Sequence, residues 1–360
     1  MNKEKKRKFI SIIRWYHSQI FSFDKEQNYH MMPLEAMQEL GYECEIFAID
    51  SQVKIEDDPN FVPWVRVIYY KNIFQYLSYL WENRNALIYS NSLTIKTLLV
   101  GLIGKRTIFM AHDQVLPLES KKIKRLIVLF FYQFFSYIRV INTDEFKLLK
   151  KYNIKSFILP LAIGKSFYSL WDKQREWGVF IWNLYADKNP QMLLDTIQEV
   201  RKKYPNFILS VLGEDRYDQN GLNFQEMVKI NGLEKNIKVC WFIPHKQLKD
   251  ILEKSYICVN TSISEGQCLA VFEAALAGCV LCLQNILSFP SVFWDRAYYH
   301  TTAQQLANNI SKALENQKTT QEKVKENQQM ILKHYDYAVI KKKLQEKIEF
   351  LFAYSLSKHS

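Results

Sequence analysis

Two carboxylates stand out in the segment SEGQCLAVFEAALAG (264–278), which follows a strand-like run and opens a helix. Glu265 and Glu273 are eight residues apart, so one lies in the loop and the other about two turns down the helix. Taken singly, Glu265 could cap its own helix and Glu273 could lie on a solvated face. Glu273, however, interrupts an apolar run, where a carboxylate must find hydrogen-bond donors. As a pair, their separation suits the two ends of a nucleotide sugar, one acid for the sugar hydroxyls and one for the ribose.

The start of this helix is expected to bind an anion. Ser264 and Gln267 have the spacing of a capping box, so free backbone N–H groups are expected around Gly266, Gln267 and Cys268. The positive end of the helix dipole adds to this attraction. Gly266 has no side chain where a phosphate or sugar would approach the backbone closely.

The elements that position these residues alternate between strand and helix in the first half of the chain. Apolar, β-rich runs predict buried parallel strands, and segments with helical spacing lie between most of them, which is the βαβ pattern. The expected strands are residues 8–14, 44–49, 65–70, 86–90, 106–112, 137–142 and 156–160, with helices at 33–40, 94–103 and 144–152.

A charged and aromatic segment, residues 165–176, breaks the alternation and predicts a linker. The same pattern then resumes, so we expect an α/β protein with two doubly wound Rossmann-like domains facing a cleft, and helices at the C-terminus. The expected domains are residues 1–168, 177–335 and a C-terminal helix at 336–360. The strands expected in the second domain are 177–183, 206–213, 237–241, 256–262 and 279–283, with helices at 190–202, 222–230, 246–254 and 267–277.

Composition narrows the class of protein. The chain has 360 residues, of which 48% are hydrophobic, and a formal net charge of +11, enough apolar content for two cores. Residues 1–170 hold 24 basic and 16 acidic residues, so the first half predicts an anionic partner. Six cysteines without a signal peptide indicate a reducing, cytoplasmic setting. No segment predicts a transmembrane helix.

At this point the sequence resembles a known family. The two glutamates match the E-x7-E signature of retaining glycosyltransferases with the GT-B fold, in the large family 4 group (glycosyl transferases group 1). DKNP (187–190), VLGED (211–215) and AGCVLCLQN (277–285) follow in the family's order and at roughly its spacings. The resemblance is strong over residues 177–340 and loose before residue 105.

The resemblance implies a role for each matched residue. Lys188 would neutralise the donor's diphosphate as charge grows on the leaving group; a solvated lysine at a helix start is the alternative. Glu265 would hold the transferred sugar and Glu273 the ribose, while Gly266, Gln267 and Cys268 would offer backbone N–H groups. His112, at the end of its strand, matches a histidine that lines the sugar pocket, although a lone histidine is also common as a structural residue.

Two positions depart from the family pattern. The family usually has an arginine five residues before the lysine, where this chain has Asn183, and Arg216 is the cation we expect to replace it. The glycine-rich turn after the first strand is also absent, because residues 15–30 contain no glycine. The acceptor loop is therefore expected to be unlike the usual one.

The resemblance implies a metal-independent hexosyltransferase that moves a sugar from a UDP- or GDP-sugar to a surface glycan or lipid-linked acceptor, as in polysaccharide biosynthesis. No cofactor besides the donor substrate and no nucleic-acid partner is expected. Two alternatives remain open: a non-catalytic GT-B subunit that binds a glycan or a partner, which the departures at residue 183 and at the glycine turn favour, and a GT-B UDP-sugar epimerase.

A basic run, KKIKR (121–125), leads directly into a charge-free stretch at 126–138. A helix of 13 residues is only about 20 Å long and cannot span a bilayer core of about 30 Å. Its apolar residues on all faces favour burial within the first domain. The basic entry and the charge of the first half favour peripheral attachment of that domain to an anionic membrane, at the cytoplasmic face.

Overall fold

The structure is a computed structural model of the chain, in which two compact units are distinguished: Met1–Gly164 together with Tyr335–Ser360, and Lys165–His334. The described residues are 7–13, 30–48, 65–70, 72–91, 93–111, 122–170, 175–181, 184–214, 222–240, 243, 245–286 and 288–353.

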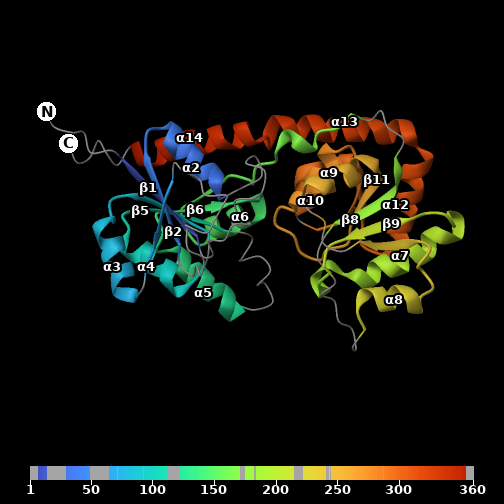
Figure 1. Cartoon of the computed structure of the whole chain (residues 1–360), viewed down its shortest axis with the longest axis horizontal. Coiled ribbons are helices and arrows are strands. Elements are labelled where there is room, and N and C mark those ends of the chain that lie inside the picture. Colours follow the sequence, from blue (N-terminus) through green and yellow to red (C-terminus); the bar gives the residue numbers. More distant parts are fainter. Residues whose placement is uncertain are drawn as a thin grey trace. The chain divides into compact units, whose positions relative to one another are not determined.

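The first unit is built on a seven-stranded parallel sheet with the order β3-β2-β1-β4-β5-β6-β7 (Figure 1). Each of the seven apolar runs expected in the first half contributes one strand, so this part of the fold prediction is confirmed. The strands are β1 (Lys8–Ile13), β2 (Glu43–Ala48), β3 (Arg66–Tyr69), β4 (Leu87–Ser90), β5 (Arg106–Met110), β6 (Tyr137–Val140) and β7 (Ser156–Ile158).

Helices cover both faces of this sheet, with α3, α4 and α5 below it and α2 and α14 above it in Figure 1. Several begin at the side-chain caps that their sequences provide: Asn72 accepts from the Gln75 N–H, and Thr94 forms a capping box with Thr97. The helices are α2 (Met31–Glu39), α3 (Ile73–Glu82), α4 (Ile95–Ile103), α5 (Lys122–Tyr132), α6 (Thr143–Lys151) and α14 (Tyr337–Ala353).

Helix α5 corrects one expectation. The stretch 126–138 was expected to be a helix buried on all faces, but α5 ends at Tyr132 and buries only Val128, Leu129 and Tyr132. Strand β6 begins at Tyr137, because the stretch also contains the start of the next buried strand. The opposite side of α5 is exposed.

The C-terminal helix α14 packs on α2 of the first unit. The Tyr337 hydroxyl donates to Glu35 at 2.7 Å, Lys341 pairs with Glu39 at 2.6 Å, and the Gln345 side chain donates to the Ala36 carbonyl at 3.0 Å. The sequence pattern set 336–360 apart as a separate helix. In the structure this segment belongs to the same compact unit as the N-terminal residues.

The second unit has a six-stranded parallel sheet with the order β10-β9-β8-β11-β12-β13. Five of its strands coincide with predicted runs, whereas the edge strand β13 was not predicted. The strands are β8 (Glu176–Ile181), β9 (Leu209–Leu212), β10 (Ile237–Cys240), β11 (Ser255–Asn260), β12 (Val280–Gln284) and β13 (Tyr298–His300).

The helices of the second unit enclose a core that includes Phe180, Leu194, Phe207 and Ile257. They are α7 (Pro190–Lys203), α8 (Phe224–Ile230), α9 (His245–Lys254), α10 (Leu269–Leu276), α11 (Ser288–Phe293), α12 (Ala303–Glu315) and α13 (Gln317–His334). In the part of the chain that the structure describes, no helix is both long enough and apolar enough to cross a bilayer.

Part of the expected linker is built into the second unit. The buried Gln328 side chain donates to the carbonyls of Ser169, at 2.7 Å, and Leu276, at 2.8 Å. Arg175 donates to the Ser255 carbonyl at 3.0 Å and to the Ala277 carbonyl at 2.8 Å. The second unit therefore starts at Lys165 rather than at residue 177.

Candidate functional site

The candidate site lies where the strand order of the second sheet reverses. From β8 the chain runs outward through β9 to β10 and then returns to add β11 on the other side of β8. The loops after β8 and β11 therefore start side by side, at the carboxyl ends of two neighbouring strands, and lead away in opposite directions. In open α/β sheets this switch point leaves a crevice that binds ligands.

The loop after β8 places Lys188 just before α7. Residues Ala186–Lys188 form a single 3₁₀ turn, and Asn189 follows in the left-handed conformation, with φ 50° and ψ 58°. Asparagine tolerates this conformation better than most residues. Pro190 then occupies the first turn of α7, where its missing N–H is not needed. The DKNP sequence thus ends the turn and fixes the position of the lysine.

The loop after β11 is bonded to the loop after β8. The Thr261 hydroxyl donates to the Lys188 carbonyl at 2.7 Å, and the Ile263 N–H donates to the Asp187 carbonyl at 2.9 Å. Asn260 and Ser262, both fully buried, hydrogen-bond to each other across Thr261. This polar triplet was not predicted from the sequence, although three polar residues ending an apolar strand are a signal for such a role.

These bonds bring Lys188 and Glu265 together. Lys188 Nζ donates to Glu265 Oε1 at 2.7 Å, and the two side chains are only 15% and 12% exposed. Asp187 Oδ2 lies 3.6 Å from the same ammonium. Burial lowers the pKa of Lys188, but the attraction and hydrogen bond of Glu265, helped by Asp187, outweigh it, so that the pKa lies above its ordinary value. Lys188 is therefore held as a cation at the edge of the sheet.

Helix α10 begins later than the sequence predicted. Its N-cap is Cys268, which makes no side-chain capping bond, and its first residue is Leu269. The prediction of a helix starting at residue 267, with a capping box of Ser264 and Gln267, is therefore wrong. Thr261 and Ile263 are hydrogen-bonded to the loop after β8, and the helix begins only after the segment that follows them. Gly266 and Gln267 lie in the turn ahead of α10 and Cys268 is buried.

Glu273 lies on the buried side of α10. Its side chain is 8% exposed, between Phe272 and Ala274, which are also buried. The interpretation of Glu273 as a residue on a solvated face is therefore excluded. A carboxylate among buried apolar residues needs hydrogen-bond donors, and the hydroxyl groups of a bound ligand can supply them.

Three predicted site residues, His112, Asn183 and Arg216, lie outside the described residues. Among the residues that the structure does describe, no group of three or more histidine, cysteine, aspartate or glutamate side chains is arranged to hold a metal ion.

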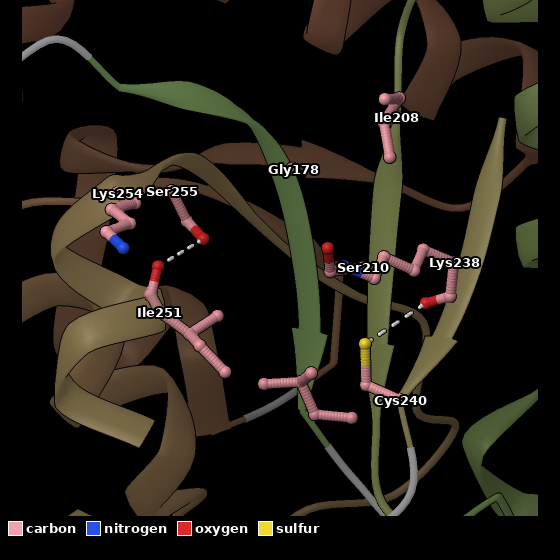
Figure 2. A pocket seen from close by; sticks show the side chains of 9 residues that line it. Gly178, Ile208, Ser210, Lys238, Cys240, Ile251, Lys254 and Ser255 are labelled. Atoms are coloured by element: carbon pink, nitrogen blue, oxygen red, sulfur yellow. Dashed lines mark hydrogen bonds between the residues drawn. The ribbon is translucent and has the colours of Figure 1, made fainter. Parts of the chain in front are cut away.

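A separate pocket of about 230 Å³ lies on one face of the second sheet. Figure 2 shows α9, with Ile251 and Lys254, forming one wall, and β9 and β10, with Ser210 and Cys240, forming the other. None of the site residues predicted from the sequence is among its lining residues. The pocket is thus distinct from the Lys188–Glu265 pair.

Comparison with known families now identifies the second unit. Residues 165–330 match the family described as glycosyl transferases group 1. These residues form a glycosyl transferases group 1 domain. The resemblance stated from the sequence is thereby confirmed at the level of this group, and the group 1 domain contains Lys188, Glu265 and Glu273.

Individual relatives extend the comparison. A subunit of phosphatidylinositol N-acetylglucosaminyltransferase from Arabidopsis thaliana is 28% identical over 145 residues, which is 39% of this chain and 32% of that protein. The chain thus spans about a third of the length of this curated relative.

Among solved structures, Anabaena HepE in complex with UDP has a TM-score of 0.75 at 14% identity, covering 95% of this chain and all of that one. Sucrose-phosphate synthase from Thermosynechococcus elongatus has a TM-score of 0.71 at 15% identity, covering 96% of this chain and all of that one. These likenesses show the fold, and the expected GT-B class with two Rossmann-like domains is confirmed.

Proposed function

We propose that the chain is a retaining glycosyltransferase that moves a sugar from a UDP- or GDP-sugar to a surface glycan or lipid-linked acceptor. The observation that carries this proposal is the Lys188–Glu265 pair at the switch point of the group 1 domain. It combines a partly buried cation with a carboxylate at the edge where α/β sheets bind nucleotides.

Each site residue has a role that its chemistry supports. The Lys188 ammonium stabilises negative charge as the nucleoside diphosphate leaves, which such a transfer reaction requires most. Glu265 accepts hydrogen bonds from the hydroxyls of the transferred sugar, and Glu273 accepts them from the ribose. Gly266, Gln267 and Cys268 supply backbone N–H groups to the sugar and phosphates. For His112, the family resemblance alone supports a role in binding the sugar.

A UDP-sugar is the first donor to test, because the structural neighbour HepE was solved with UDP. We propose hexose transfer without a metal ion and without a cofactor besides the donor, since Lys188 supplies the charge that a divalent cation would otherwise provide. Asn183 stands where an arginine would strengthen phosphate binding, and Arg216 is the proposed replacement.

A lipid-linked acceptor is supported by the name of the Arabidopsis relative, which specifies phosphatidylinositol. A glycan of a polysaccharide pathway is the other acceptor class. We propose the cytoplasm as the compartment, because five of the six cysteines are buried, as core thiols of a protein from a reducing compartment commonly are.

The test is a donor screen followed by nucleotide release. Wild-type protein is incubated with each UDP- and GDP-sugar, and release of UDP or GDP is measured for it, for Lys188→Ala, and for Lys229→Ala as a matched control on the exposed side of α8. We expect Lys188→Ala to lower turnover by about two to three orders of magnitude and Lys229→Ala to match the wild type. Equal turnover in a folded Lys188→Ala protein would refute the assignment.

The same screen separates the alternatives. A non-catalytic subunit binds nucleotide without releasing it from a nucleotide sugar, and an epimerase returns an isomeric nucleotide sugar. Proton NMR of the transferred sugar determines whether the anomeric configuration is retained.

A further inference from the structure

Helix α5 of the first unit presents an apolar stripe to solvent. Ile123, Leu126, Ile127 and Phe130 each expose between 51% and 76% of their surface. Their spacing of i, i+3, i+4 and i+7 places them along one side of the helix. Val128, Leu129 and Tyr132 are buried on the other side and hold the helix against the domain core. The residues of the apolar stripe therefore do not contribute to the packing of the domain core.

Basic residues flank the stripe on both sides. At 100° per residue, Lys122 and Lys124 lie about 90° to 110° from the centre of the stripe, one on each side. Both are exposed, and neither α4 nor α5 contains an acidic residue. Lysine side chains in these positions can extend past an apolar surface and keep their ammonium groups in a polar layer.

Two neighbouring helices extend the apolar surface. The Tyr76 hydroxyl of α3 donates to the Lys96 carbonyl of α4, and Gly101 of α4 approaches Phe134 so closely that a Cβ would lie 3.0 Å from it. Helices α3, α4 and α5 thus lie together on one face of the first sheet (Figure 1). Of the twenty exposed large apolar residues among those described, nine are on these three helices: Ile73, Phe74, Trp81, Ile95, Leu102, Ile123, Leu126, Ile127 and Phe130.

We propose that this α3–α4–α5 surface docks on an anionic lipid bilayer, with α5 lying in the interface and its apolar stripe inserted between the headgroups. The 11 residues of α5 form a helix of about 16 Å, too short to span the bilayer but suited to lying in its plane. The three helices together carry four basic residues and one acidic residue, which complements negatively charged headgroups.

Two further contacts favour a lipid surface. The Arg84 guanidinium stacks over the Trp81 ring at 4.7 Å, which places a cation beside an aromatic side chain of the kind enriched at membrane interfaces. Lys96 lies 5.3 Å from the centre of the Tyr70 ring. A cation thus accompanies the exposed Trp81 of α3, and Lys96 of α4 lies beside the partly buried Tyr70. The inference concerns the first unit and does not depend on the proposed transferase site.

The experiment is cosedimentation of the full chain with vesicles of phosphatidylcholine alone or with 30% phosphatidylglycerol, at low and high salt. We expect binding to the anionic vesicles that falls with salt. Lys122→Gln with Lys124→Gln should weaken it roughly tenfold or more, because each lysine near an anionic surface contributes on the order of 1 kcal/mol. Leu126→Ser with Phe130→Ser should weaken binding by a similar factor at both salt concentrations, because it removes the inserted apolar area.

Matched controls are Lys229→Gln with Lys325→Gln, and Ile230→Ser with Phe350→Ser, which alter exposed residues elsewhere. Both should bind vesicles like the wild type. Binding that is equal for neutral and anionic vesicles, or unaffected by the α5 substitutions, would overturn the proposal. The proposal would also be overturned if the chain bound no vesicle and formed a dimer in sedimentation velocity that Leu126→Ser with Phe130→Ser dissociates. The stripe would then contact a second copy of the chain.

Discussion

Lys188 Nζ and Glu265 Oε1 lie 2.7 Å apart, although 77 positions separate the two residues in the chain. The ammonium that is proposed to neutralise the donor's diphosphate is thus paired with the carboxylate proposed to hold the sugar. A single ammonium cannot give its full attraction to both groups. The nucleotide therefore competes with Glu265 for Lys188, and this competition has a measurable consequence.

Glu265→Gln should tighten the binding of free UDP or GDP by about threefold to tenfold while lowering the turnover of the nucleotide sugar. The substitution removes the charge that competes for Lys188 but also weakens the contact with the sugar hydroxyls. Titration calorimetry with the free nucleotide gives the affinity, and nucleotide release gives the turnover. An unchanged or weaker affinity for the free nucleotide would show that the ion pair does not compete with the diphosphate.

Much of the fold was predictable because buried parallel strands are continuous apolar runs. Strand β13 was missed because it has only three residues, and its two tyrosines are half-buried at the edge of the sheet. The stretch after Arg125 was misjudged for a different reason. An apolar run predicts that part of a segment is buried. Which side of α5 is buried depends on the helices and strands that pack against it.

The site was predictable in its residue types but not in its contacts. Lys188, Glu265 and Glu273 stand in motifs with recognisable spacing, whereas the pairing of Lys188 with Glu265 depends on β8 and β11 being neighbours in the sheet. Strand order is a property of the whole domain. The start of α10 was misplaced because the bonds from Thr261 and Ile263 to the β8 loop, which keep the following residues out of the helix, are also long-range.

Glu273→Gln should weaken the binding of free nucleotide and of nucleotide sugar by the same factor, about tenfold. The proposed partner of Glu273 is the ribose, which both ligands contain, and losing a charge-assisted hydrogen bond costs about 1.5 kcal/mol. Titration calorimetry with both ligands provides the comparison, and Glu234→Gln, at an exposed loop position, is the control. A loss confined to the nucleotide sugar would move Glu273 from the ribose to the sugar.

Gly278→Ala should destabilise the second unit more than Gly232→Ala does. Both glycines have positive φ, 91° and 60°, so both substitutions introduce backbone strain of about 1 kcal/mol. A Cβ at Gly278 would also lie 2.6 Å from Arg175 Nη2, whereas nothing lies within 4 Å of one at Gly232. Moving the guanidinium weakens its bond to the Ala277 carbonyl, which adds about 1 to 3 kcal/mol. Urea unfolding measures both effects, and equal losses would mean that Arg175 moves without cost.

His300 makes the stability of the second unit depend on pH. Its side chain is 1% exposed, neither ring nitrogen has a hydrogen-bond partner, and burial lowers its pKa from 6.5 to about 4. In the unfolded chain His300 becomes protonated below about pH 6.5, whereas in the folded chain it stays neutral down to about pH 4. The neutral ring therefore makes its full contribution to the free energy of unfolding above pH 6.5. This contribution is lost as the pH falls, by about 3 kcal/mol in total.

Urea unfolding of wild type and His300→Leu at pH 7.5, 6 and 5 isolates this effect from that of the carboxylates, because only the wild type carries the histidine contribution. We expect the wild type to lose stability relative to His300→Leu as the pH falls, whereas replacing the exposed His334 by glutamine should leave the wild-type pH dependence nearly unchanged. A difference between the two proteins that stays constant from pH 7.5 to 5 would show that His300 accepts its proton equally well in the folded and unfolded chains.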